Sequence, residues 1–244
     1  MGRAKDLIVK PISSKDANRI IKSLHYSGKV VQNSQVHLGV FLDGKCGGAM
    51  QFGPSLHKRN MLGIVEGTLW NEFIELNRMA LSDWLPRFGE SRVISVCMRF
   101  LKKSYPYLKW VVSFADGTQC GDGTIYRASG FVLTQIKANN HIIELSDGTI
   151  GADITYMKGS HCCKQKGRAG VPVGAKRLEG FQLRYIYFLD PTARDLLTVP
   201  IIPFSEIERR GAGMYRGKPR VRSVDSDTSA NHAEEGGANP TRTL

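Results

Sequence analysis

The sequence has no long hydrophobic run. No apolar stretch in its 244 residues approaches the roughly 20 residues that a membrane-spanning helix needs. Residues 1–6 lead into no apolar signal-peptide segment. The hydrophobic content of 41% is nevertheless ordinary for a globular protein, and this length suffices for one substantial core. We therefore expect no membrane association, a cytoplasmic location and one main domain.

Cysteine is scarce and poorly arranged for cross-linking. The five cysteines are odd in number, and the adjacent Cys162 and Cys163 are poorly suited to pairing with each other. We expect free thiols. His161 precedes that pair, but no Cys-x-x-Cys and no matching distant pair completes the four ligands of a zinc site.

Acidic residues are few beside the basic ones, with 22 Asp and Glu against 34 Lys and Arg, which leaves a net charge of +12. Residues 158–177 hold six Lys or Arg and no acid, and residues 209–222 repeat the bias. Such clusters release counterions from a polyphosphate, so they favour a nucleic-acid partner over a mere solubility role. The expected phosphate contacts are Lys164, Lys166, Arg168, Lys176 and Arg177.

Hydrophobic periodicity predicts an α/β fold. A capped amphipathic helix follows Ser13, and a hairpin turns at residues 43–45. A second helix opens at residues 89–91, and its apolar residues form a stripe expected to face the core, namely Val93, Ile94, Cys97, Phe100 and Leu101. The other expected strands are residues 61–65, 73–80, 110–115, 131–136 and 181–189. We expect a catalytic domain over residues 7–208, with a hairpin and basic loop inserted at 141–180. Residues 209–244 are expected to be a disordered basic and polar tail.

Regular alternation along residues 73–80 places Phe73, Glu75, Asn77 and Met79 on one face and Ile74, Leu76 and Arg78 on the other. An ion pair between Glu75 and Arg78 is therefore not expected. A guanidinium in such an apolar strand needs an anion, and Glu66, Glu72 or a cofactor phosphate remain candidates.

Residues 111–131 are the most informative segment. They predict a buried strand, a polar glycine-rich loop, a short helix and the start of another strand, and such a concentration of polar residues favours a site. Asp116 and Tyr126 are the first candidates for chemistry. The alternative interpretation makes Asp116 a turn residue and Tyr126 a half-buried helix residue.

Several short blocks carry a resemblance to a known family. They are His25-Tyr26-Ser27-Gly28-Lys29, Gln51-Phe52-Gly53-Pro54-Ser55, Trp70-Asn71-Glu72-Phe73-Ile74-Glu75-Leu76-Asn77-Arg78, Ser113-Phe114-Ala115-Asp116-Gly117 and Ile125-Tyr126-Arg127-Ala128-Ser129-Gly130-Phe131-Val132-Leu133. In this order they resemble the Mom DNA-modification proteins of Mu-like bacteriophages, over about residues 7–188. The resemblance implies a fold like that of GNAT N-acyltransferases, with a central mixed sheet flanked by helices.

The resemblance also implies an activity. It predicts a transferase that converts the N6 amine of adenine in phage DNA to a carbamoylmethyl (acetamido-type) adduct and so protects the DNA from restriction in the host-cell cytoplasm. The substrate would be double-stranded DNA with a flipped adenine. The alternatives are a non-catalytic nucleic-acid-binding protein and a CoA-dependent N-acyltransferase acting on another amine.

Roles for single residues follow from that resemblance. Asp116 would bind or deprotonate the amine, and Tyr126 would protonate a departing thiolate. His25 and Tyr26 would meet the flipped base, although a cap and a core aromatic are their ordinary roles. Together with Asp116 they also offer imidazole, phenolate and carboxylate ligands suited to iron.

Acetyl-CoA is the cofactor that the resemblance implies. Its pyrophosphate would lie at the start of the helix that opens at residues 89–91, with Arg78, Arg87 and Ser91 as candidate contacts. The usual Gln/Arg-x-x-Gly-x-Gly/Ala signature is missing, and residues 86–91 stand in its place. Simple acetyl transfer would leave an N-acetyl group, so a carbamoylmethyl product requires further chemistry. The oligomeric state does not follow from the sequence.

Overall fold

A computed structural model describes residues 2–119, 121–156, 172–215 and 218–219. Its elements are β1 (Ile8–Pro11), α1 (Ser14–Leu24), β2 (Val36–Leu42), β3 (Lys45–Gly53), α2 (Lys58–Leu62), β4 (Phe73–Leu81), α3 (Gly89–Ser104), β5 (Trp110–Asp116), α4 (Thr124–Ala128), β6 (Val132–Ala138), β7 (Ile142–Glu144), β8 (Ile150–Ala152), α5 (Asp153–Tyr156), β9 (Lys176–Leu178), β10 (Phe181–Phe188), α6 (Ser205–Arg209), β11 (Met214–Tyr215) and β12 (Lys218–Pro219).

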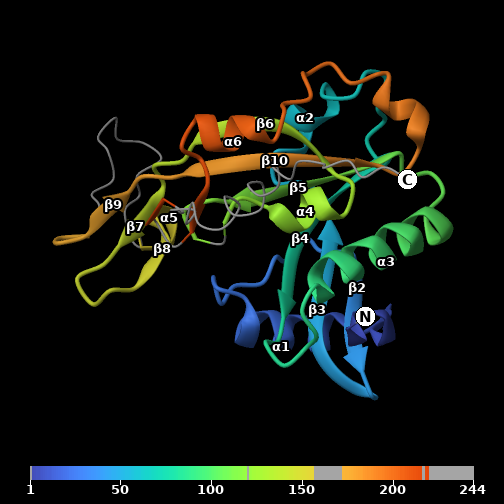
Figure 1. Ribbon diagram of the computed structural model, residues 1–244, viewed down its shortest axis with the longest axis horizontal. Coiled ribbons are helices and arrows are strands. Elements are labelled where there is room, and N and C mark those ends of the chain that lie inside the picture. Colours follow the sequence, from blue (N-terminus) through green and yellow to red (C-terminus); the bar gives the residue numbers. More distant parts are fainter. Residues whose placement is uncertain (1, 120, 157–171, 216–217, 220–244) are drawn as a thin grey trace, which may run out of the picture.

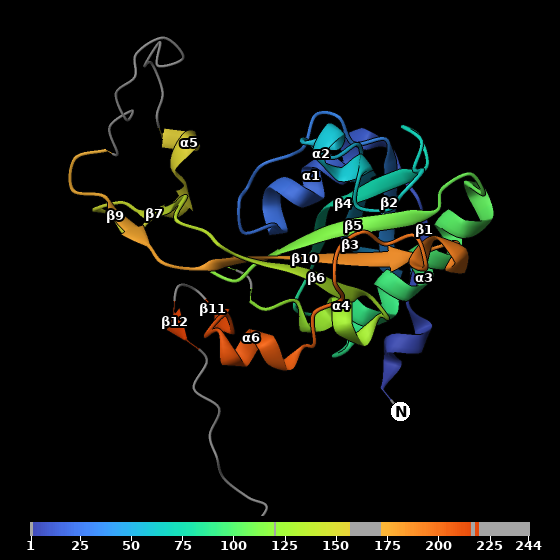
Figure 2. The ribbon, with the colours of Figure 1, turned by 90° about the horizontal axis from the view of Figure 1, so that it is seen from above.

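A seven-stranded sheet in the order β1-β2-β3-β4-β5-β10-β6 forms the centre (Figure 1). Helices α1 and α2 lie on one face of it, and α3, α4 and α6 lie on the other (Figure 2). The strands β7, β8 and β9 form a separate three-stranded sheet that stands away from the main body as an arm. The predicted α/β class, with a central mixed sheet flanked by helices, is confirmed.

The parallel pair β4–β5 opens the middle of the sheet. These strands pair only at their beginnings, through Phe73 with Trp110, Ile74 with Val111 and Glu75 with Val112. Beyond that point β4 stays paired with β3, while β5 stays paired with β10. The two strands therefore diverge, and their later residues face a gap in the sheet.

The two helical layers hold the diverging halves in place. The predicted stripe of α3 is buried, including Val93, Ile94 and Cys97, and it packs in the same cluster as Leu38 and Leu133 of the sheet. On the opposite face Ala17 and Ile21 of α1 are fully buried against Ala49 and Ala80. Buried apolar area of this kind contributes about 25 cal/mol per Å², which makes these contacts the main support of the fold.

A β-bulge in β4 changes the faces expected from the sequence. Gln51 pairs with Arg78 and Phe52 pairs with Leu76, so Asn77 has no partner in the ladder. An extra residue reverses the alternation beyond it. Met79 accordingly packs with the α3 layer, whereas Arg78 contacts the loop that follows α1. The prediction that Glu75 and Arg78 point to opposite faces is therefore wrong.

Three further differences concern element boundaries. The expected strand at 61–65 is wrong, because α2 occupies Lys58–Leu62 and Val65 forms only an isolated bridge with Leu197. Strand β1, which the sequence did not predict, pairs with β2. Structure also continues past residue 208, since Ala212 is completely buried in the main core.

Other predictions near the ends and the insertion have mixed outcomes. Within residues 141–180, β7 and β8 form an antiparallel pair. Most of the expected tail, residues 216–217 and 220–244, lies outside the described residues. Within the described ranges, no helix combines the length and apolar character that crossing a bilayer demands.

Candidate active site

A cavity of about 480 Å³ occupies the gap between β4 and β5. One wall is the second half of β4, the other is the end of β5 with the loop into α4, and the turn after α1 contributes from the side. Its lining residues are His25, Tyr26, Glu75, Leu76, Asn77, Arg78, Met79, Glu90, Phe114, Ala115, Asp116, Gly121, Asp122, Gly123, Thr124, Ile125, Tyr126 and Gln182. It thus brings together five residues predicted from the sequence, namely His25, Tyr26, Arg78, Asp116 and Tyr126.

Asp116 is the last residue of β5, where the strand leaves the sheet. Its Oδ1 accepts the backbone N–H of Thr118 at 3.0 Å, and its Oδ2 lies 3.5 Å from Nε2 of Gln119. Burial raises the pKa of the Asp116 carboxyl. A carboxylate with a raised pKa is a better proton acceptor than an ordinary aspartate, which suits it to an amine substrate.

Glu75 is a second acid of the cavity, and it was not among the site residues predicted from the sequence. Burial raises its pKa, while hydrogen bonds to Ser55 and Asn77 and the nearby charge of Arg78 act in the opposite direction. Asn77 is itself fixed, because its Oδ1 accepts the hydroxyl of Ser34 at 3.1 Å. Regular alternation places Glu75 and Arg78 on opposite faces of the strand. Glu75 could therefore be recognised as a site residue only once the bulge was known.

His25 ends α1 and is held by its own turn. The backbone N–H of Ser27 donates to Nδ1 at 3.1 Å, and the Ser27 hydroxyl lies 2.8 Å from the same atom. Burial, with a smaller contribution from the charge of Arg78, lowers the pKa of His25 to about 4. The ring is therefore neutral at pH 7. Because Nδ1 accepts, the proton resides on Nε2, which makes that atom a donor.

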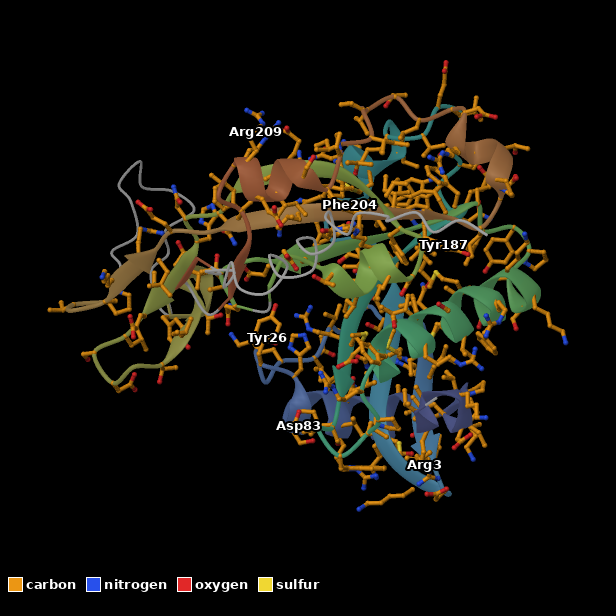
Figure 3. The ribbon with its side chains drawn as sticks, viewed as in Figure 1. Arg3, Tyr26, Asp83, Tyr187, Phe204 and Arg209 are labelled. Carbon is orange, nitrogen blue, oxygen red and sulfur yellow. The ribbon has the colours of Figure 1, made fainter. Side chains whose placement is uncertain are left out.

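Tyr26 stands at the side of the cavity with 52% of its surface exposed. Its ring lies 4.2 Å from the ring of His25, centroid to centroid, with an interplanar angle of 32°. Figure 3 shows the side chain projecting from the loop after α1. An exposed aromatic beside a cavity offers a stacking surface for a planar ligand.

The iron hypothesis gains no support from this geometry. His25, Tyr26 and Asp116 do line one cavity, but the lone pair of His25 Nδ1 is already engaged and Nε2 carries the proton. Over the part of the chain that the structure describes, no group of three or more His, Cys, Asp or Glu residues is placed to hold a metal ion. We derive no step through a metal.

Tyr126 is nearly buried on α4, with 8% exposure. Its ring packs against Phe131 at 5.4 Å and Tyr185 at 5.1 Å. Gly123 begins the helix with a φ of 77°, and a side chain there would meet the Tyr185 ring at 2.6 Å. Glycine is thus required to bring α4 and Tyr126 against the cavity.

The first turn of α3 is where the sequence predicted an anionic cofactor group. The backbone N–H of Gly89 donates to the carbonyl of Pro86, and that of Arg92 donates to the carbonyl of Phe88, so only the N–H groups of Glu90 and Ser91 in this turn are left to a ligand. Nε of Arg92 is buried without a partner among the described residues. Ser91 lies in this turn, and its hydroxyl donates to the carbonyl of Phe88 at 3.3 Å. Arg87 stacks its guanidinium over Phe88 at 5.9 Å. These groups fit a pyrophosphate.

Arg78 lies away from that turn. Its Nε donates to the carbonyl of Lys29 at 3.2 Å and its Nη1 donates to the carbonyl of Asn77 at 2.7 Å. The α1 layer therefore holds this guanidinium, while α3 covers the opposite face of the sheet. Arg78 accordingly borders the cavity from the side of His25 and Tyr26.

The cavity is acidic although the chain is basic. Among the described residues that line it, the carboxyl groups are those of Glu75, Glu90, Asp116 and Asp122, and Arg78 is the one Lys or Arg. Carboxylates repel phosphate and accept hydrogen bonds from amines. A neutral group bearing N–H donors fits this interior, and a phosphate backbone does not.

The predicted DNA contacts lie on the arm or beyond the described residues. Lys176 is exposed on β9, whereas Arg177 donates to Asp153 Oδ2 at 2.9 Å and to the carbonyl of Asn140 at 2.6 Å. Lys29 hydrogen bonds to Thr155, which links the turn after α1 to the arm. Lys164, Lys166 and Arg168 fall outside the described residues.

Comparisons with known proteins identify the family. The model of the Mom protein family matches residues 6–206. A relative named methylcarbamoylase mom, from Escherichia phage Mu, is 36% identical over 204 residues, which cover 81% of this chain and 82% of the relative. The chain belongs to the Mom protein family.

Solved structures with similar folds are more distant. The ribosomal-protein-S18-alanine N-acetyltransferase from Escherichia coli is 12% identical, with a TM-score of 0.44 over 75% of this chain and 94% of that one. A GNAT family acetyltransferase from Elizabethkingia anophelis with acetyl-CoA bound is 11% identical, with a TM-score of 0.41 over 75% of this chain and 98% of that one.

Proposed function

We propose that this protein modifies the N6 amine of adenine in phage DNA, forming a carbamoylmethyl (acetamido-type) adduct that protects the DNA from host restriction. The observation that carries the proposal is the acid-lined cavity between β4 and β5, with Asp116 on one wall and Glu75 on the other, in a member of the Mom family. A methylcarbamoylase is 36% identical to the chain. We assign the methylcarbamoylation in that relative's name to the cavity of this chain.

The cavity size bears on how the base enters. A space of about 480 Å³ accommodates a purine but not a duplex. The target adenine must therefore leave the base stack, which costs a few kcal/mol of unstacking and unpairing. The exposed ring of Tyr26 offers a surface on which the extruded base stacks.

Proton removal is the task that the carboxylates perform. The N6 lone pair is delocalised into the ring, so the amine becomes a competent nucleophile only when it is positioned and a proton is taken away. Asp116 accepts one N6–H, and Glu75, on the opposite wall, is a second carboxylate that can accept a proton. The neutral His25, with its proton on Nε2, donates to an oxygen in which negative charge develops.

The proposed donor is an acyl-CoA. When bound, it supplies an activated acyl group as a thioester. The first turn of α3, with Arg92 and Ser91, would hold its pyrophosphate, and Tyr126 on the adjacent α4 would donate a proton to the departing thiolate. Acetyl transfer alone leaves N6-acetyladenine, so the carbamoylmethyl product includes chemistry beyond that transfer.

The DNA duplex is bound by the basic segments of the chain. Residues 158–177 and 209–222 carry the excess positive charge. Phosphate contacts give affinity without sequence information, so we expect short recognition contexts around the adenine. The cluster of carboxyl groups in the cavity disfavours the alternative of a purely binding protein, because acids at its working surface would repel phosphate.

Nucleoside mass spectrometry of DNA from cells that express the full chain tests the proposal. We expect a new deoxyadenosine mass with the wild type, and its loss with Asp116→Asn and with Tyr126→Phe. Asp147→Asn, in the turn between β7 and β8 far from the cavity lining, is the matched control and retains the adduct. Unmodified DNA from folded wild-type protein favours the non-catalytic alternative. Unmodified DNA together with an acylated small amine in extracts of the same cells favours the general acyltransferase.

A further inference from the structure

Gln182 is the cavity residue that neither the resemblance nor the acid chemistry explains. It is an exposed residue of β10 and lines the cavity. It is also the direct partner of Asp116 in the antiparallel pair β5–β10. Directly opposed residues point to the same face with Cβ atoms about 4.5–5.5 Å apart. An amide and a carboxylate therefore enter the cavity side by side.

The two neighbours differ in what they hydrogen bond. A carboxylate only accepts, whereas the primary amide of glutamine accepts through Oε1 and donates through Nε2. Within the described parts of the chain, the Gln182 amide has no intramolecular hydrogen bond, while Asp116 is tied to Thr118. Both amide groups of Gln182 are thus available to a ligand.

Adenine matches this pair of side chains. On the edge of N6 and N7 it presents a donor beside an acceptor, whereas guanine presents two acceptors there, cytosine only a donor, and thymine only an acceptor. A glutamine amide pairs with N6–H and N7 at the same time. The second N6–H then points along the other edge of the base, where a neighbouring carboxylate accepts it.

We propose that Gln182 is the specificity-determining residue of this site: its amide binds the N6–H and N7 edge of the extruded adenine, while the adjacent Asp116 accepts the other N6–H. This inference rests on the proposed function, which supplies adenine as the substrate. Gln182 selects the base and holds the amine in plane. Asp116 acts on the proton.

The first test measures adduct in cells. Gln182→Met keeps the side-chain length but removes the donor and the amide oxygen. A bidentate contact of this kind corresponds to about a ten- to hundredfold effect, and we expect a loss of that size in adduct formed per unit of protein. Gln135→Met, on the neighbouring β6 and outside the cavity, is the control and is expected to keep full activity.

The second test isolates the N7 contact and needs no donor molecule. Full-length protein is titrated with a labelled duplex that carries one adenine opposite an abasic site, which lowers the cost of extrusion. A matched duplex carries 7-deazaadenine, in which a C–H group replaces N7. Both titrations contain excess ordinary duplex as competitor. Wild type should bind the 7-deaza duplex about ten- to hundredfold more weakly, and Gln182→Met should bind the two duplexes equally.

The outcomes separate this inference from the function on which it rests. Absence of adduct with the wild type defeats the proposed function. If the wild type forms the adduct but binds both duplexes equally, only the assignment of Gln182 is overturned. The same holds if Gln182→Met keeps the wild-type ratio of affinities for the two duplexes. Because Gln182 is exposed, its substitution removes no buried contact, and an unchanged unfolding midpoint verifies that the variant is folded.

Discussion

Glu75 and Arg78 face the same cavity, although an odd separation along a regular strand places side chains on opposite faces. The bulge at Asn77 produces this arrangement, and the charge of Arg78 acts on the Glu75 carboxyl. The Glu75 carboxyl and the Arg78 guanidinium thus lie on one wall of the cavity, and Asp116 lies on the opposite wall. Each of the two strands supplies one half-buried acid.

Removing the charge of Glu75 should impair the reaction. Glu75→Gln keeps the shape and the hydrogen bonds to Ser55 and Asn77, so the fold should persist. We expect adduct formation to fall by about a hundredfold or more, the size typical of lost acid–base assistance. The measurement is nucleoside mass spectrometry. Glu179→Gln, at an exposed position outside the cavity, serves as control. Wild-type adduct levels in folded Glu75→Gln would remove Glu75 from the mechanism.

His25 should make stability depend on pH. Its folded pKa of about 4 lies below the ordinary 6.5, so between these values the unfolded chain binds a proton that the folded chain does not. Stability from this group is therefore complete above pH 6.5 and is lost as the pH falls toward 4, by up to about 3 kcal/mol.

Chemical denaturation at pH 7 and pH 4.5 checks this dependence. Wild type should lose more free energy of unfolding between the two values than His25→Gln does. The half-buried acids Glu75 and Asp116, with raised pKa values, contribute in the opposite direction in both proteins, so the difference isolates His25. Equal losses in the two proteins would contradict the prediction.

Gly53 should be needed for the bulge. A Cβ at this position would meet Asn77 Oδ1 at 2.6 Å and the carbonyl of Asn33 at 2.7 Å. Gly53→Ala should therefore destabilise the protein by about 1–3 kcal/mol, as overpacking does. Gly63→Ala is the matched control, because its Cβ has no neighbour within 4 Å. The measurement is the urea midpoint of unfolding for wild type, Gly53→Ala and Gly63→Ala. Equal midpoints would contradict the prediction and would show that Asn77 moves without an energetic cost.

Lys176 and Arg177 should behave differently despite being neighbours. Lys176→Ala removes an exposed cation and should reduce the salt dependence of DNA binding by about one counterion. Arg177→Ala removes the ion pair at 2.9 Å with the buried Asp153, so it should also destabilise the arm. Fluorescence titrations at several salt concentrations and limited proteolysis of the arm separate the two effects. Identical behaviour of both variants would contradict this division.

Tyr26 should support base binding by stacking. Tyr26→Ala is expected to weaken binding of a duplex with an unpaired adenine by about 1–3 kcal/mol, the value of one base–aromatic contact. Tyr107→Ala is a close control, since Tyr107 has 51% of its surface exposed against 52% for Tyr26 and lies outside the cavity lining. Unchanged affinity of Tyr26→Ala would place the base elsewhere.

Local signals in the sequence were sufficient to predict the hairpin between β2 and β3 and the helices α1 and α3. Asp43 and Gly44 both have positive φ angles, as the predicted hairpin turn requires, and Ser13 caps α1 by accepting the N–H of Asp16 at 3.0 Å. The apolar stripe of α3 fixed which side of that helix is buried. These features depend on neighbours within a few residues, so a single sequence carries them completely.

The tertiary structure decided the site. Whether Asn77 bulges depends on the close approach of Gly53 and Ser34 across neighbouring segments, and that bulge turns Arg78 to the face of Glu75. The pairing of Gln182 with Asp116 likewise follows from the register between β5 and β10. Such registers are set by packing between distant segments, and a shift of one residue reverses every side chain. The sequence thus determined which elements form and which residues could act, whereas packing of the assembled sheet determined which of them share the cavity.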